Sequence, residues 1–170
     1  ALAVDAGKQH NPKEAARLYH NVLQHDPGYT PLVLDKIEQC YLDNDDRQGF
    51  YQYLIDNKAN PCVSFAVKYS EYIEQFEGAD KALAFILKSL EQKPNIRAFV
   101  QLLSLESKNT DSEQAAAQFV KLKELVSRYL DSKPLFECRN CGLATRQHYW
   151  LCPSCQTWGN CKPAMGLDGL

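Results

Sequence analysis

The sequence predicts an all-α solenoid of paired helices, followed by a small metal-binding ribbon. Helical segments recur every 33 or 34 residues, and two identical Cys-x-x-Cys pairs follow them between Cys138 and Cys155. A period of this length is typical of stacked helical repeats, and paired cysteines at this spacing are typical of a metal site. We therefore expect a helical-repeat domain at 1–132, a metal ribbon at 133–160 and a tail at 161–170.

The composition is that of an ordinary globular protein. The 170 residues are 45% hydrophobic and 24% charged, with a formal net charge of -2. This balance excludes extended disorder and gives no overall attraction for nucleic acid or anionic lipid. No apolar run approaches the ~18 residues of a membrane-spanning helix, so we expect this part of the chain to be soluble. Because the chain opens at Ala1 inside a helical pattern, we also expect an N-terminal truncation, with an upstream segment whose contents, including an anchor, the sequence does not reveal.

The second helix of each repeat is the most regular element. Its small residue recurs at intervals of 34, 33 and 33 positions, and a bulky residue four places later keeps the same intervals. These two side chains share one helix face, so a neighbouring helix can approach closely at one point and fill the next gap. Proline closes three of the four segments. The segments are 14–27, 48–61, 81–94 and 114–127, the small residues are Ala15, Gly49, Ala82 and Ala115, and the bulky ones are Tyr19, Tyr53, Ile86 and Phe119.

Partner helices fill the intervals between these segments and carry apolar stripes of their own. Stripes at helical spacing predict that one face of each partner helix is buried. Leu2 to Ala6 would be the remnant of a first partner helix. The stripes of the other three are Val33, Ile37 and Cys40; Cys62, Ala66, Tyr69, Ile73 and Phe76; and Phe99, Leu102 and Leu103.

The last helix departs from the repeat. Its start is predicted by Thr110 and Glu113, which have the spacing of a capping box. Its apolar spacing continues past the end of the repeat unit, so we expect it to stop near Asp131 and to cover the exposed end of the solenoid. Since only a few residues separate it from the cysteines, we expect the ribbon to pack on the end of the helical stack.

The pattern A…Y/F…P in the second helix and the 34-residue period resemble tetratricopeptide repeats over roughly residues 1 to 131. The Trp and Gly-Tyr of the first helix in those repeats are mostly absent here. The resemblance implies a curved groove that binds a protein or peptide. Four residues off the packing stripes are expected to line it, although such aromatic residues more often belong to the edge of the core: Tyr41, Phe65, Lys68 and Tyr72.

The two cysteine pairs predict one tetrahedral metal site. Ten residues separate Cys138-x2-Cys141 from Cys152-x2-Cys155, and each turn can present two thiolates to one ion. Roughly thirty residues bury too little apolar surface to fold alone, so metal binding should supply most of the folding energy of the ribbon. The donors suit one zinc or iron ion bound by four cysteines. We expect a small aromatic core of Phe136, Tyr149, Trp150 and Trp158.

Other chemistry at the cysteines is less well supported. A thioredoxin-like pair would need one Cys-x-x-Cys in a βαβ context, and a secreted disulfide framework does not fit the odd count of seven cysteines. His148 and Cys161 are alternative ligands, but the simpler reading is a surface imidazole and a spare thiol. Cys40 and Cys62 lie on apolar helical faces, where free cysteine behaves as a small hydrophobe.

Nucleic-acid binding and catalysis find little support. From Lys133 onward four basic residues stand against two acidic ones, and four thiolates on a divalent ion cancel the excess of +2. We find no phosphate-binding loop, no nucleophile elbow and no triad-like spacing of histidines, so we expect no enzyme.

The repeats, the ribbon and the tail together resemble the lipopolysaccharide assembly protein B (LapB/YciM) family of Gram-negative bacteria. The motifs are C-x2-C-G…Y-W-x-C-P-x-C, of rubredoxin type, and the tail KPAMGLDGL. The resemblance implies an adaptor at the cytoplasmic face of the inner membrane, held by an N-terminal anchor absent here. It implies a role in lipopolysaccharide assembly, in which the membrane protease FtsH degrades the lipid A deacetylase LpxC. In that family the ribbon docks on the repeats, and the metal ligands carried over are Cys138, Cys141, Cys152 and Cys155.

The sequence departs from the rubredoxin pattern at one position, and two alternative functions stay open. Gln156 follows the second pair where rubredoxins often have glycine. A rubredoxin-like iron protein that transfers electrons is the first alternative, and a generic tetratricopeptide cochaperone is the second. The choice between zinc and iron, the partner surfaces and the oligomeric state, including a homodimer, stay open.

Overall fold

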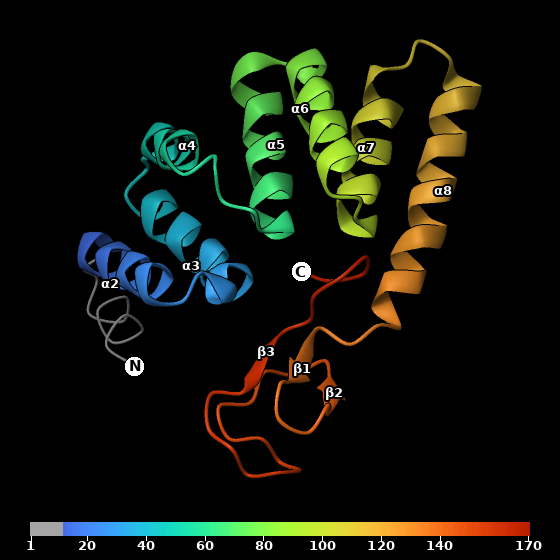
Figure 1. Cartoon of the computed structure of the whole chain (residues 1–170). Helices are drawn as coiled ribbons and strands as arrows, with labels where there is room; N and C mark the ends of the chain where they lie inside the picture. Colours follow the sequence, from blue (N-terminus) through green and yellow to red (C-terminus); the bar gives the residue numbers. More distant parts are fainter. Residues whose placement is uncertain (1–11) are drawn as a thin grey trace. The chain divides into compact units, whose positions relative to one another are not determined.

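The computed structural model describes residues 12–170, so the expected helix at Leu2 to Ala6 lies outside the described residues. This range contains seven α-helices and a small three-stranded sheet, and it confirms the predicted helical fold with a C-terminal ribbon (Figure 1). The chain divides into two compact units, one up to Phe65 and one over Ala66–Leu170. No helix within 12–170 is long and apolar enough to cross a membrane.

In the described part of the first unit, from residue 12 onward, three complete helices pack in chain order. They are α2 (Pro12–His25), α3 (Thr30–Leu42) and α4 (Arg47–Asp56), with a short 3₁₀ turn, η1 (Pro27–Tyr29), between the first two. Of the predicted packing residues, Ala15 and Ile37 are buried, at 0% and 1% exposed, whereas Val33 is only partly buried. The buried face of α4 is formed by Phe50 and Leu54, both 0% exposed, which the repeat pattern did not predict.

The repeat pattern alone does not explain why position 49 is a glycine. The carboxylate of Asp46 caps α4 and accepts a hydrogen bond from the backbone N–H of Gly49 at 2.8 Å. A Cβ at position 49 would collide with that carboxylate. Glycine at this position therefore makes room for the helix cap.

The second unit holds the remaining helices and the ribbon. Helix α5 (Val63–Glu77) begins at the border between the units and is followed by α6 (Ala79–Gln92), α7 (Ile96–Asn109) and α8 (Glu113–Asp131). The predicted small and bulky pair on α6 is fully buried, since Ala82 and Ile86 are both 0% exposed. The ring of Tyr69 on α5 lies edge-on to Phe85 on α6, with 5.0 Å between the centroids.

The predicted start of the last helix is wrong by two residues. Ser112, and not Thr110, caps α8, because its side chain accepts a hydrogen bond from the backbone N–H of Ala115. Thr110 instead ends α7, where its N–H is bonded to the carbonyl of Glu106. The predicted end near Asp131 is confirmed.

The ribbon is a three-stranded antiparallel sheet in the order β2-β1-β3. Its strands are β1 (Phe136–Cys138), β2 (Ala144–Thr145) and β3 (Cys161–Pro163). Arg146, directly after β2, donates hydrogen bonds to the backbone carbonyls of Asp131, the last residue of α8, and of Lys133 just beyond it. This contact fixes the ribbon to the last helix.

A second attachment comes from the tail after β3, which runs to the N-terminal end of α7 (Figure 1). The side-chain oxygen of Asn95 accepts hydrogen bonds from the N–H groups of Arg97 and Ala98 in the first turn of α7. Its amide donates to the carbonyls of Gly166 and Gly169 at 3.2 and 3.3 Å. The N–H of Ile96 donates to the carbonyl of Leu167 at 2.9 Å. The ribbon and its tail thus pack on the ends of α7 and α8, as predicted.

Tyr53 on α4 provides a prediction about alkaline stability. Burial raises the pKa of its phenol to about 12, with a smaller contribution from Tyr41. Between pH 10 and 12 the unfolded chain releases this proton and the folded chain keeps it, so the free energy of unfolding falls as pH rises through that range. The free energy of unfolding, measured by urea denaturation, should therefore fall more steeply between pH 10 and 12 for the wild type than for Tyr53→Phe. Parallel profiles would contradict the assignment.

Candidate metal centre

Two turns of the same backbone shape carry the four cysteines. The N–H of Cys138 donates to the carbonyl of Leu143, and the N–H of Gly142 donates to the carbonyl of Cys138, both at 2.9 Å. The second turn repeats this pattern fourteen residues later: Cys152 donates to Thr157 at 3.0 Å, and Gln156 donates to Cys152 at 2.9 Å. Equivalent hydrogen bonds give each turn the same loop and aim its two thiols at one point.

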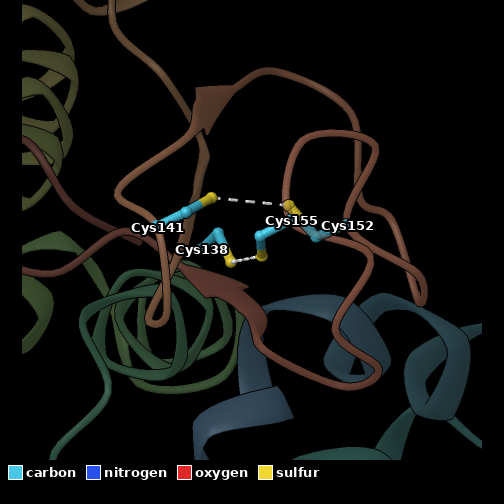
Figure 2. Close-up of side chains that lie close together, drawn as sticks. All are labelled: Cys138, Cys141, Cys152 and Cys155. Carbon is cyan, nitrogen blue, oxygen red and sulfur yellow. Dashed lines mark hydrogen bonds between the residues drawn. The ribbon is translucent and has the colours of Figure 1, made fainter.

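The four sulfur atoms form a compact group (Figure 2). The Sγ atoms of Cys138 and Cys155 are 3.7 Å apart, and those of Cys141 and Cys152 are also 3.7 Å apart. All four ligand atoms lie within 4.8 Å of one another. Each close pair joins one turn to the other, so an ion among the four would cross-link both.

These distances fit a tetrahedral metal ion. A zinc–sulfur bond of ~2.3 Å in tetrahedral geometry places neighbouring sulfur atoms ~3.8 Å apart. A disulfide would need ~2.05 Å, and all four cysteines are free thiols. The four cysteines are therefore placed to hold one metal ion. The donor set suits zinc as well as iron.

The electrostatics of the group also favour a cation. The Thr157 hydroxyl lies 3.0 Å from Sγ of Cys155 and holds the pKa of that thiol at about 5. The backbone N–H of Cys141 lowers the pKa of Cys138. For Cys141 the N–H of Leu143 favours the thiolate, but lost hydration and the neighbouring thiol of Cys155 raise the pKa to about 11. Several thiolates this close repel one another, and a bound cation removes that repulsion.

The residue after each second cysteine adopts a left-handed conformation. Gly142 has φ 74° and Gln156 has φ 55°. Only glycine takes this conformation without steric cost, so the glutamine stores strain at the place where the sequence departs from the rubredoxin pattern. Nothing lies within 4 Å of a Cβ built on Gly142, so its substitution would add backbone strain alone.

We predict opposite effects at these two positions. Gln156→Gly should raise the stability of the metal-loaded ribbon by about 0.5–1 kcal/mol, and Gly142→Ala should lower it by about 1 kcal/mol. Thermal unfolding of the zinc-loaded protein measures both. If both variants changed the stability by the same amount and in the same direction, the left-handed backbone would not be the cause of the changes.

The predicted aromatic core is half wrong. Phe136 is buried and Tyr149 packs against the cysteine cluster, but Trp150 is 57% exposed and Trp158 is 73% exposed. The centre of the ribbon is filled by the thiols of Cys138 and Cys152 together with a third cysteine, so it has no room for an indole. The structure corrects the prediction, and both tryptophans lie on the surface of this unit.

The third cysteine in that cluster is Cys161, which is fully buried and lies opposite Cys138 in the pairing of β1 with β3. The metal-binding group found over 12–170 does not include it or His148. The ring of His148 lies between those of Phe136 and Trp150, with centroid distances of 5.3 and 4.6 Å. Cys161 therefore packs as a buried thiol beneath the site. No sequence pattern predicts this position, because it depends on strand register.

The four residues predicted to bind a protein lie in different environments. Phe65 and Tyr72 are only 2% and 3% exposed, which corrects the expectation that they line an open groove, because both face the core. Lys68 forms an ion pair with Glu71 at 3.7 Å. Tyr41 lines a pocket among α2, α3 and α4. A binding role for Lys68 and Tyr41 stays a prediction.

The fold and the site agree with comparisons to known proteins. Residues 136–163 match the family described as "Rubredoxin metal binding domain", so the C-terminal part of the chain has the form of a rubredoxin-type metal ribbon.

The relatives extend the likeness through the helices. The chain is 26% identical over 158 residues to lipopolysaccharide assembly protein B of Escherichia coli strain K12, and 24% identical over 159 residues to the protein of that name from Haemophilus influenzae. Each match covers 92% of this chain. The chain spans about two fifths of the length of these relatives, 41% and 40%.

Proposed function

We propose that this chain is the metal-bearing end of a non-enzymatic adaptor in lipopolysaccharide assembly. The observation that carries the proposal is the continuous similarity to lipopolysaccharide assembly protein B, which runs through the helices and the ribbon alike. The ion would act as a structural cross-link that holds the two cysteine turns together, and the attachments to α7 and α8 would hold the ribbon on the helices.

The finer part of the proposal concerns the partners. We propose that the adaptor promotes degradation of the deacetylase LpxC by the membrane protease FtsH, at the cytoplasmic face of the inner membrane. The exposed side chains of Leu122, Leu125 and Tyr129 support a binding role. They lie three and four positions apart on α8, so they form an apolar stripe of the kind that helices use to contact partners.

A hybrid protein tests this function. In the Escherichia coli relative, the segment that matches this chain would be replaced by the chain, in a strain without its own copy. We expect the hybrid to restore rapid turnover of LpxC, measured by immunoblot after translation is stopped. The same hybrid with Cys138 and Cys141 changed to serine should not restore it, whereas Cys62→Ser, a change outside the ribbon, should. A hybrid that is folded and metal-loaded but leaves LpxC stable would contradict the proposal.

A further inference from the structure

A pocket of about 650 Å³ lies within the first unit, among α2, α3 and α4. Its volume falls in the range of sites that bind small molecules or single side chains. It is far from the cysteine ribbon in the sequence, and the metal site does not involve it. Its lining is unusual, because polar side chains from all three helices meet there beside aromatic rings.

The polar lining consists mainly of hydrogen-bond acceptors. The side-chain amides of Asn44 and Asn57 donate to the backbone carbonyls of Cys40 and Tyr53, both at 2.8 Å. Each bond uses one of the two N–H groups of its amide, and the carbonyl oxygen of each side chain can accept hydrogen bonds from an occupant. The pocket thus offers two amide acceptors at its edge.

Two carboxylates add negative charge to the same lining. One oxygen of Asp46 accepts the N–H of Gly49, and one oxygen of Asp56 accepts the amide of Gln52 at 2.8 Å. The other oxygen of each has no hydrogen-bond donor among residues 12–170. Arg17, the one arginine among the lining residues of the described range, is already bound through two of its nitrogens to a glutamate outside the pocket, at 2.6 and 2.9 Å. Among the described lining residues, the charge that is not already paired is therefore negative.

Aromatic rings form the wall. The rings of Tyr41 and Tyr53 are 6.2 Å apart, and His20 lies edge-on to Tyr53 at 5.9 Å. Tyrosine faces attract cations. The Nδ1 atom of His20 is buried and has no hydrogen-bond partner within the described part of the chain. Since buried polar atoms are nearly always paired, this atom points to a missing hydrogen-bond partner, which is a donor when the proton of the imidazole is on Nε2.

We propose that this pocket binds the guanidinium of an arginine side chain presented by a partner protein. A guanidinium carries a positive charge and five N–H donors without an acceptor, so it complements a lining of carboxylates, amide oxygens and tyrosine faces. A smaller adjoining pocket of about 330 Å³ shares His20, Tyr53, Asp56 and Asn57 with the first. This neighbouring space accommodates the residues that flank the arginine, so the occupant is a peptide segment.

The test uses the whole zinc-loaded chain labelled with ¹⁵N and a short blocked peptide, Gly-Arg-Gly. We expect saturable shifts of the amide signals of α2, α3 and α4, with none in the ribbon. The matched peptide with citrulline, which has the same shape without the charge, should bind at least about tenfold more weakly. A second matched peptide carries lysine in place of arginine. The proposal would be overturned if the citrulline peptide or the lysine peptide bound as tightly as the arginine peptide, or if no peptide gave saturable shifts.

Two variants locate the binding in the pocket. Asp56→Asn and Asp46→Asn each remove a charge and keep the size of the side chain, and asparagine still caps α4 in the second. Each should weaken binding of the arginine peptide about tenfold, whereas Asp80→Asn on α6 should not change it. Binding that survives both pocket variants, with their spectra still those of folded protein, would also overturn the proposal. Because the assay needs neither FtsH nor LpxC, its outcome is independent of the proposed adaptor function.

Discussion

Replacing Cys138 and Cys141 by serine should release the metal and unfold residues 136 to 160 while the helices remain. These two cysteines supply half of the four sulfur donors, and each lies 3.7 Å from a sulfur of the second turn. Metal binding supplies roughly 10 kcal/mol or more of folding free energy in small structural zinc sites. A sheet of three strands, each two or three residues long, has no comparable source of stability.

Metal analysis and amide NMR measure this result. We expect less than one tenth of the metal content of the wild type, loss of dispersed signals from the ribbon and unchanged signals from α2 to α4. Cys62→Ser is the matched control, since it removes a thiol outside the site and should retain the metal. Full metal content in the double variant would contradict the ligand assignment. The absorption spectrum of the wild type identifies the ion, because a ferric tetrathiolate is coloured and reducible and zinc is neither.

Asn95→Asp should detach the tail from α7 and destabilise the second unit by about 2–4 kcal/mol. Asn95 is only 3% exposed and has two roles: its side-chain oxygen caps α7, and its amide donates to the carbonyls of Gly166 and Gly169. Aspartate keeps the capping oxygen but turns both donors into acceptors that face carbonyl oxygens. The variant therefore separates attachment of the tail from capping of the helix.

Hydrogen exchange distinguishes the two roles. In Asn95→Asp the N–H of Ile96, which is bonded to the carbonyl of Leu167, should lose its protection together with the amides of 166–170. Ser112→Ala is the control, since it removes the cap of the neighbouring α8, should cost about 1 kcal/mol and should leave the tail protected. Unchanged exchange of the tail in Asn95→Asp would show that this side chain does not hold it.

The parts of the structure that local patterns determine could be predicted from the sequence. The period placed Ala82 and Ile86 on one buried face because side chains four apart on a helix always share a face. The spacing of the cysteines predicted the metal group, since each pair is enclosed in one short turn. Local hydrogen bonding decided these features, so a single stretch of sequence was sufficient.

Features that depend on distant neighbours could not be predicted in this way. Phe65 and Tyr72 were placed on an open groove because they lie off the expected stripe, but helix α5 is buried over a wider arc than one stripe. Trp150 and Trp158 were assigned to a core that three cysteines occupy, which follows from strand pairing. The cap at Thr110 failed for another reason: two candidate caps compete within three residues, and the end of α7 takes the first.

The hydrogen bonds between Asn95 and the tail join residues 71 and 74 positions apart, whereas only the four residues 26–29 separate α2 from α3. Closing a long loop costs more entropy than closing a short one, and contacts between distant residues slow folding. The order of events during synthesis follows from this difference. Helices α2 to α4 can assemble while the chain is still emerging from the ribosome, but the N-terminal end of α7 gains its bonds to the tail only when synthesis is complete, so the metal-bearing end matures last.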